Sequence, residues 1–395
     1  MKKLWWTLAG LMLAQKLWKS WLVRRFFARP VPAPAREVGL VSVIQPILSG
    51  DPTLGECLAA NLAARSGYDL EFIWLIDDDD AAARALCGEL AARSARPVEI
   101  VSLPPPAERA NPKTIKLVAG MERARGDVVC VLDDDTRLPD GGLEQCLPYL
   151  NQPGVGLAFG LPYYRHFGNL WSGLVSLFVN GQSLLTYVPY TALSEPFTIN
   201  GMFYALRRDV LDAVGGFAGL EGILADDFAV ASRLREHGYR LAQTPLRHAI
   251  STHVSGPRHY LSLIQRWFIF PRESLLRHLS PYQQGIVYGL GALPALFPLA
   301  LALRLAFRPS RAAGAYAALY FGHSLWAYRR IDAAYLGRAT PAAWAWAVPL
   351  VETVFPLQLL AALLAPQRIV WRGHVMQVER GGEFHFISRR VRDKG

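Results

Sequence analysis

A short apolar run that ends in three consecutive aspartates constrains this chain most strongly. Residues 128–132 are apolar, and Asp133, Asp134 and Asp135 follow them directly. Such a run is typical of a strand buried in a parallel sheet. Because an unpaired carboxylate is costly to bury, the acids must lie at the strand's exit and face a cation or hydrogen-bond donors. Asp133 and Asp135 suit a hard divalent ion, Mg²⁺ or Mn²⁺, which most often bridges a diphosphate. An acidic turn or a helix N-cap is the alternative.

A second apolar run, residues 71–76, also ends in acids, from Asp77 to Asp80. Strand-like and helix-like segments alternate around both runs, which predicts an α/β fold with a mostly parallel sheet over residues 38–255. Ligands of open α/β sheets bind outside the carboxyl ends of the strands, so both acid clusters should face one crevice. We expect strands at 40–46, 70–76, 97–103, 127–133 and 154–160, and helices at 54–66, 80–95, 112–125 and 141–150.

The later part of the chain predicts membrane helices. The chain of 395 residues is 52% hydrophobic with a mean hydropathy of +0.17, too apolar for an ordinary soluble enzyme. Residues 285–366 supply most of this excess through three nearly uncharged segments, 285–307, 312–328 and 342–365. Buried helices of a large soluble core are the alternative. Pro294 and Pro298 also allow a re-entrant hairpin in the first segment, so the number of crossings stays open.

Three further regions flank these parts. Residues 1–28 predict an N-terminal anchor, as an interfacial helix, a short membrane helix or a signal peptide; Arg24 and Arg25 oppose the last. Residues 256–284 predict an amphipathic interface segment, because apolar residues alternate with Arg266 and Arg272. Residues 367–395 form a basic tail on the cytosolic side.

Charge and cysteine content limit the binding partners and the cellular compartment that we expect. The net charge of +10 is concentrated beside the apolar segments, which favours an anionic membrane surface. The globular part lacks a basic stripe interleaved with aromatic residues, so we expect no nucleic-acid binding. The four cysteines form no CxxC pair and are expected to be buried thiols in a reducing compartment.

A third acidic pair, Asp226 and Asp227, begins a predicted helix that ends near Gly238. Acids in the first helical turn also stabilise the helix dipole, which is the alternative to a functional role. Gly201 lies upstream in a predicted strand and turn, where it would admit close approach of a ligand.

The acid clusters, the amphipathic segment and the apolar segments follow one another along the chain. In this order they resemble the membrane-anchored family 2 glycosyltransferases, and most closely the ceramide glucosyltransferase group, from about residue 38 to 385. The resemblance implies a GT-A fold with Asp227 as catalytic base and Arg266 and Trp267 completing the active site at the membrane surface. It implies nucleotide-sugar binding by Asp77, Asp80, Lys113, Asp133 and Gln265, and a metal on Asp133 and Asp135. The group commonly has Gln or Arg three residues before the arginine; here Leu263 takes that place and Gln265 is displaced next to Arg266.

The same resemblance implies inverting transfer of a hexose from a nucleotide sugar, first UDP-glucose, to a membrane lipid hydroxyl, first ceramide. Alternatives are a hopanoid or diacylglycerol acceptor with UDP-N-acetylglucosamine or UDP-galactose as donor. A processive polysaccharide synthase is disfavoured by the three short segments and Leu263. A non-enzymatic adaptor would have lost the acids. The expected partners are the nucleotide sugar, the lipid acceptor and the bilayer, and the expected location is a bacterial inner membrane, multi-pass, with the active site facing the cytoplasm.

Overall fold

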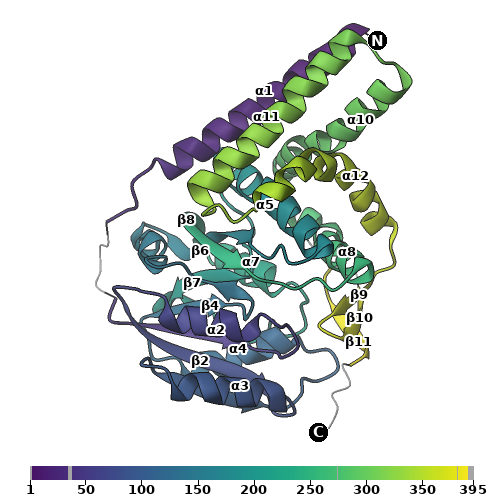
Figure 1. The fold of residues 1–395 in the computed structure, drawn as a ribbon. Coiled ribbons are helices and arrows are strands. Elements are labelled where there is room, and N and C mark those ends of the chain that lie inside the picture. Colours follow the sequence, from purple (N-terminus) through teal and green to yellow (C-terminus); the bar gives the residue numbers. More distant parts are fainter. Residues whose placement is uncertain (1, 34–37, 274, 380, 390–395) are drawn as a thin grey trace.

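The computed structural model describes residues 2–33, 38–273, 275–379 and 381–389. A large sheet with helices on both faces lies at one end of the molecule, and long helices from both ends of the chain lie at the other (Figure 1). The helices are α1 (Lys2–Phe27), α2 (Leu54–Ala63), α3 (Ala81–Ala92), α4 (Pro112–Arg123), α5 (Leu170–Thr191), α6 (Arg208–Ala213), α7 (Asp226–Glu236), α8 (Pro257–Glu273), α9 (Pro281–Val287), α10 (Leu293–Phe307), α11 (Arg311–Tyr335) and α12 (Val348–Leu364).

The large sheet is mixed but mostly parallel, as predicted. Its strands lie in the order β3-β2-β1-β4-β7-β6-β8-β5. Only β7 and β5 run opposite to the other described strands of this sheet. The bounds are β1 (Leu40–Pro46), β2 (Asp69–Asp77), β3 (Val98–Leu103), β4 (Val128–Leu132), β5 (Thr136–Arg137), β6 (Val155–Tyr164), β7 (Phe203–Arg207) and β8 (Arg240–Ile250).

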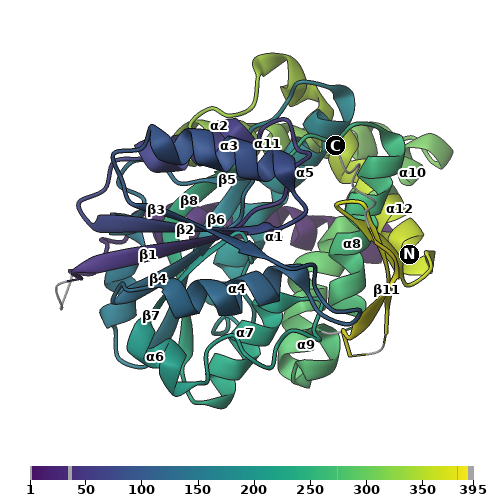
Figure 2. The ribbon, with the colours of Figure 1, turned by 90° about the horizontal axis from the view of Figure 1, so that it is seen from below.

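The sheet is covered on both faces, which explains why its strands read as continuous apolar runs. In β2, Phe72 and Trp74 join the core beneath α2 and α3, whereas Ile73 and Leu75 join the core against α4, α6 and α7. Successive side chains of a strand point to opposite faces, so a strand buried on both faces must be apolar throughout. Figure 2 shows the two helical layers on either side of the sheet.

Two segments of the helical end are long and apolar enough to cross a bilayer, Pro281–Phe307 and Ala342–Leu364. The third predicted segment also forms a long helix, α11, but this helix is less apolar than the other two segments. Its polar residues include His323 and Ser324. The anchor α1 lies beside α11 (Figure 1), and Ala9 and Met12 pack with Leu301 of α10 and residues of α11.

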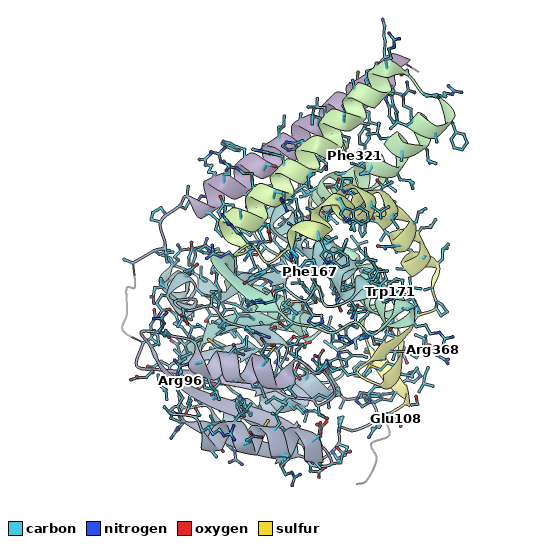
Figure 3. The ribbon with its side chains drawn as sticks, viewed as in Figure 1. Arg96, Glu108, Phe167, Trp171, Phe321 and Arg368 are labelled. Atoms are coloured by element: carbon cyan, nitrogen blue, oxygen red, sulfur yellow. The ribbon has the colours of Figure 1, made fainter. Side chains whose placement is uncertain are left out.

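Aromatic side chains fill the junction between the sheet and the helical end. Phe167 lies 5.8 Å from Trp344 and Trp171 lies 5.7 Å from Tyr260, measured between ring centroids (Figure 3). A buried aromatic ring removes a large apolar area from water, so these contacts join the two ends into one packed unit.

The structure differs from the sequence prediction in two elements. The helix predicted at 141–150 is instead two short 3₁₀ helices, Leu143–Gln145 and Leu147–Asn151, because Pro148 has no N–H for an α-helical bond. The predicted basic tail contains an antiparallel sheet of β9 (Arg368–Trp371), β10 (His374–Val378) and β11 (Phe384–Ser388). Of its basic residues, Arg380, Arg390, Arg392 and Lys394 lie outside the described residues.

Candidate active site

A cavity of about 1350 Å³ lies where the strand ends of the large sheet meet α5, α8 and the long helices. Residues predicted for the site line it from five separate stretches of the chain: Asp77, Lys113, Asp133, Asp135, Asp227, Arg266 and Trp267. The structure does not place Asp80 and Gln265 among the lining residues. The large sheet therefore brings together most of the predicted site.

The reversed strand β7 explains how the second and third acid clusters meet. Since β7 is antiparallel to β4, the start of β7 lies beside the exit of β4. The N–H of Asp133 donates to the carbonyl oxygen of Met202 at 2.9 Å. The segment before β7 thus contacts the aspartate run, and Gly201 places this segment against Asp227.

Lys113 connects these clusters electrostatically. Its ammonium group lies 2.8 Å from a carboxylate oxygen of Asp133 and 3.1 Å from one of Asp226, and it donates to the Gly201 carbonyl oxygen at 2.9 Å. These two ion pairs and one hydrogen bond offset the charge of the buried ammonium group. The predicted nucleotide contact by Lys113 stays a prediction.

The N-terminus of α4 holds Lys113 in place. The Asn111 side chain accepts a hydrogen bond from the Lys113 N–H at 3.0 Å and donates to the carbonyl oxygens of Ile223 and Leu224. This N-cap therefore also fixes the segment that leads into α7 and Asp227.

Asp227 has the protonation behaviour of a general base. Burial and, next, the neighbouring charge of Asp226 raise the pKa of Asp227 to about 7, against the opposing charge of Lys113. A base with a pKa near neutrality combines sufficient ionised form with useful proton affinity. A Cβ at position 201 would lie 3.0 Å from the Cβ of Asp227 and 3.2 Å from its Oδ2, so this approach needs glycine.

Asp133 and Asp135 fit a divalent cation by their donor chemistry. Burial raises the pKa of Asp133 to about 6 against the opposing charge of Lys113, and burial also raises the pKa of Asp135. Both carboxylates therefore carry desolvation that a bound cation would offset. No group of three or more His, Cys, Asp or Glu suited to a metal occurs among the described residues. Two carboxylates completed by substrate phosphates and water are what Mg²⁺ commonly uses.

The tail sheet supplies an arginine that the sequence prediction did not assign to the site. Arg372 donates to both carboxylate oxygens of Asp134, at 2.7 and 2.5 Å, and to the Leu48 carbonyl oxygen at 3.3 Å. The Leu48 N–H in turn donates to Asp134 at 2.9 Å. Arg372 and Asp134 both line the cavity, so the tail closes one side of the site.

The other three predicted nucleotide-binding residues also have protein partners. Asp77 lines the cavity and pairs with Lys116 at 2.8 Å. Asp80 caps α3 by accepting from the Ala83 N–H and also accepts from the Ser49 N–H, and its nucleotide contact stays a prediction. The amide of Gln265 donates to the carbonyl oxygens of residues 366 and 368, away from the cavity, because helical spacing directs it to another face than Arg266.

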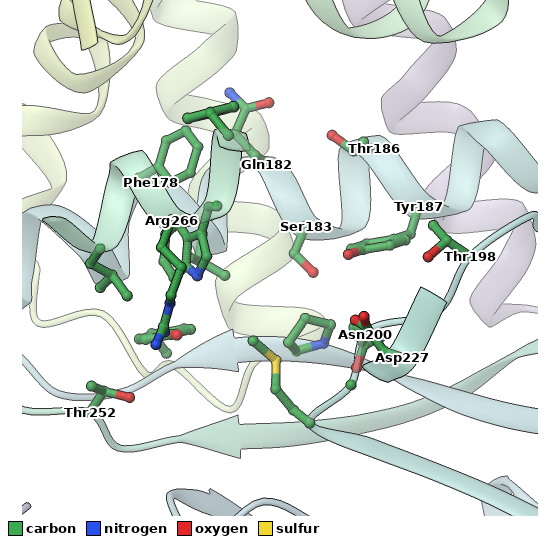
Figure 4. A pocket seen from close by; sticks show the side chains of 18 of the residues that line it. Phe178, Gln182, Ser183, Thr186, Tyr187, Thr198, Asn200, Asp227, Thr252 and Arg266 are labelled. Carbon is green, nitrogen blue, oxygen red and sulfur yellow. The ribbon is translucent and has the colours of Figure 1, made fainter. Parts of the chain in front are cut away.

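Helix α8 places Arg266 and Trp267 over the acids. Arg266 projects from α8 between α5 and the strand ends (Figure 4), where the charges of Asp133 and Asp135 act on it. The ring of Trp267 lies 6.2 Å from the rings of both Tyr164 and Phe178. A half-buried cation thus lies close enough for the charges of the two carboxylates to act on it.

The fold and the cavity together define a glycosyltransferase of the GT-A type. The chain belongs to glycosyl transferase family 21, whose family model matches residues 4–384. It is similar to ceramide glucosyltransferase 3 of Caenorhabditis elegans, with 23% identity over 263 residues, 63% of this chain. The chain spans about half that relative, 55% of its length.

A solved structure supports the fold. The mannosyltransferase PcManGT from Pyrobaculum calidifontis, in complex with GDP-Man and Mn²⁺, is 19% identical, with a TM-score of 0.51 over 89% of this chain and 97% of that one. At this identity the likeness concerns the fold, and it confirms the predicted GT-A architecture.

Proposed function

We propose that this protein transfers a hexose from a nucleotide sugar to a hydroxyl group of a membrane lipid, with inversion at the anomeric carbon. The observation that carries the proposal is that one cavity is lined both by the acid clusters and by residues of the long apolar helices, such as Pro298 and Leu359. UDP-glucose and ceramide are the first substrates to test, because the similar nematode protein is a ceramide glucosyltransferase. We place the protein in the membrane with several crossings and its active site facing the cytoplasm.

The residues divide the work as follows. The acceptor oxygen attacks the anomeric carbon while the bond from that carbon to the diphosphate breaks, and Asp227 takes the acceptor proton. Positioned proton transfer of this kind contributes about 10²- to 10⁴-fold in rate. Arg266 would place positive charge against the departing nucleoside diphosphate. A divalent cation held by Asp133 and Asp135 would supply Lewis-acid stabilisation of the same phosphates.

The test is a transfer assay on membranes that contain the full chain. UDP-glucose, UDP-galactose and UDP-N-acetylglucosamine are offered with ceramide, diacylglycerol and a hopanoid polyol, with and without EDTA. We expect metal-dependent label in one lipid, and loss of that label in Asp227→Asn with nucleotide affinity nearly intact. Asp69→Asn, at an exposed aspartate outside the cavity, is the matched control. Label only in a long water-soluble polymer would instead establish a polysaccharide synthase.

A further inference from the structure

Helix α5 presents a stripe of hydroxyl groups to the cavity. Ser183, Thr186, Tyr187 and Tyr190 follow the spacing i, i+3, i+4, i+7 and all line the cavity. This spacing places side chains on one face of a helix. Figure 4 shows Ser183 and Tyr187 directed toward the region of Asp227 and Asn200. Because α5 packs against both β6 and α1, the stripe lies between the sheet and the long helices.

The buried polar atoms without a hydrogen-bond partner include two on residues that line the cavity, the Oγ of Ser183 and the Oδ1 of Asn200. Their residues are only 5% and 4% exposed. The amide orientation of Asn200 is fixed because its Nδ2 donates to the Gly160 carbonyl oxygen at 2.7 Å. An unpartnered polar atom in a protein interior costs free energy, so a pair of them next to a reactive group points to a ligand that satisfies them.

The chemistry of this stretch is uncharged. Lys113, Arg266 and Arg372 are grouped with the aspartates of the nucleotide side, whereas the stretch formed by α5 and Asn200 offers hydroxyl and amide groups. A serine hydroxyl both donates and accepts, but an amide Oδ1 only accepts. The ligand must therefore donate an O–H or N–H to Asn200.

We propose that Ser183 and Asn200 form an acceptor subsite for an uncharged head group that carries a second hydroxyl or an amide close to the reacting hydroxyl. This inference rests on the proposed lipid glycosylation and narrows its acceptor class to diols, polyols and hydroxy-amides. A monohydroxyl lipid would leave both buried atoms unpaired, and a site built to bind a polar group discriminates against a ligand that lacks it.

The test compares two acceptor amphiphiles of equal chain length, one with the second polar group and one without it. We expect the wild type to prefer the first in kcat/KM. Ser183→Ala should reduce that preference by about three- to tenfold, Ser183→Thr should retain it, and the KM for the nucleotide sugar should stay unchanged. Equal use of both amphiphiles by the wild type, or an equal loss for both in Ser183→Ala, would overturn the subsite.

A matched control lies on the same helix. Ser176 is also buried in α5, but its hydroxyl donates to the His166 carbonyl oxygen at 2.8 Å, and it does not line the cavity. Ser176→Ala should lower Tm and leave acceptor preference unchanged, whereas Ser183→Ala should not lower Tm, because its hydroxyl has no partner to lose.

A binding measurement tests the subsite independently of the transfer reaction. If the wild type glycosylates neither amphiphile, the proposed function fails, and the Tm increase caused by each amphiphile in detergent still tests the subsite. We expect a larger increase with the amphiphile that carries the second polar group, and no such difference in Ser183→Ala. Equal increases in the wild type would contradict the inference.

Discussion

The protonation state of Asp227 should control the rate. Its pKa of about 7 and its proposed role as base predict that kcat/KM rises with pH through about 7 and is level above it. Asp226→Asn removes a negative charge that raises this pKa, so the rising limb should move to lower pH. A pH–rate profile of both proteins measures the shift, and an unmoved limb would show that another group is the base.

The same carboxyl group should couple stability to pH. Its folded pKa lies above the unfolded value of about 3.9, so the folded state binds the proton more tightly. The stability it contributes is fully present below about pH 4 and is lost as pH rises through 7. Asp227→Asn should therefore reduce the fall in Tm over this interval.

The close approach of Gly201 to Asp227 gives a second prediction at this scale. In Gly201→Ala the new Cβ would meet the Asp227 side chain at 3.0 Å and displace it. A displacement of about 1 Å in a catalytic group can cost about 100-fold in rate, and the shift needed here is smaller, so we expect kcat to fall by about three- to tenfold. Gly222→Ala is the control, since a Cβ there meets no atom within 4 Å. Similar kcat values for the two variants would refute this account.

At the scale of elements, the tail sheet contacts two segments of the candidate site, the aspartate run and the segment that leads into α7. Arg372 binds Asp134 in the aspartate run, and the Leu224 N–H donates to the Gly382 carbonyl oxygen at 2.9 Å, next to the start of α7. An isolated bridge between Ile223 and Glu383 adds to this contact. The tail therefore acts as a part of the active site that follows the membrane helices in the chain.

Removal of the Arg372 guanidinium should weaken donor binding. Asp134 is 3% exposed, and loss of one partner of a buried ion pair costs about 3–5 kcal/mol, here lessened because Arg372 is partly exposed. We expect Arg372→Ala to lower Tm and raise the KM for the nucleotide sugar about tenfold, with partial rescue in Arg372→Lys. Arg368→Ala, at an exposed position of the same sheet (Figure 3), should change neither. An unchanged donor KM in Arg372→Ala would rule out this positioning role.

The sequence was sufficient to predict the elements that have a strong local pattern of apolar residues. The apolar runs of β2 and β4, the helix after Asp226 and the amphipathic α8 all follow from hydrophobic periodicity and from the residues at their ends. The partners of Arg372 and Gln265 were not predictable in this way. Arg372 and Asp134 are 238 residues apart in the chain, so no local pattern links them, and only the docked tail brings them into contact. Likewise, the three partners of Lys113 depend on the reversal of β7.

At the scale of the whole molecule, the anchor α1 is tied to the later helices by a buried charge. Lys16 lies 2.9 Å from Glu352 of α12, and its ammonium also donates to Ser324 of α11. The Lys16 and Glu352 side chains are 20% and 17% exposed. Ionisable residues among apolar helices are costly unless paired, so this pair fixes how the first helix packs against the last ones.

A double substitution tests whether the ion pair of Lys16 and Glu352 links these helices. Lys16→Met leaves Glu352 without its cation and should destabilise the protein in detergent by up to about 3–5 kcal/mol, seen as a lower Tm. Lys16→Met with Glu352→Met should recover part of that loss, because two apolar side chains of suitable volume often replace a buried pair at little cost. Lys3→Met, at an exposed position of α1, should be neutral. If the single and double variants lose equal stability, the pair does not link the helices, and the anchor is held by its apolar contacts with α10 and α11 alone.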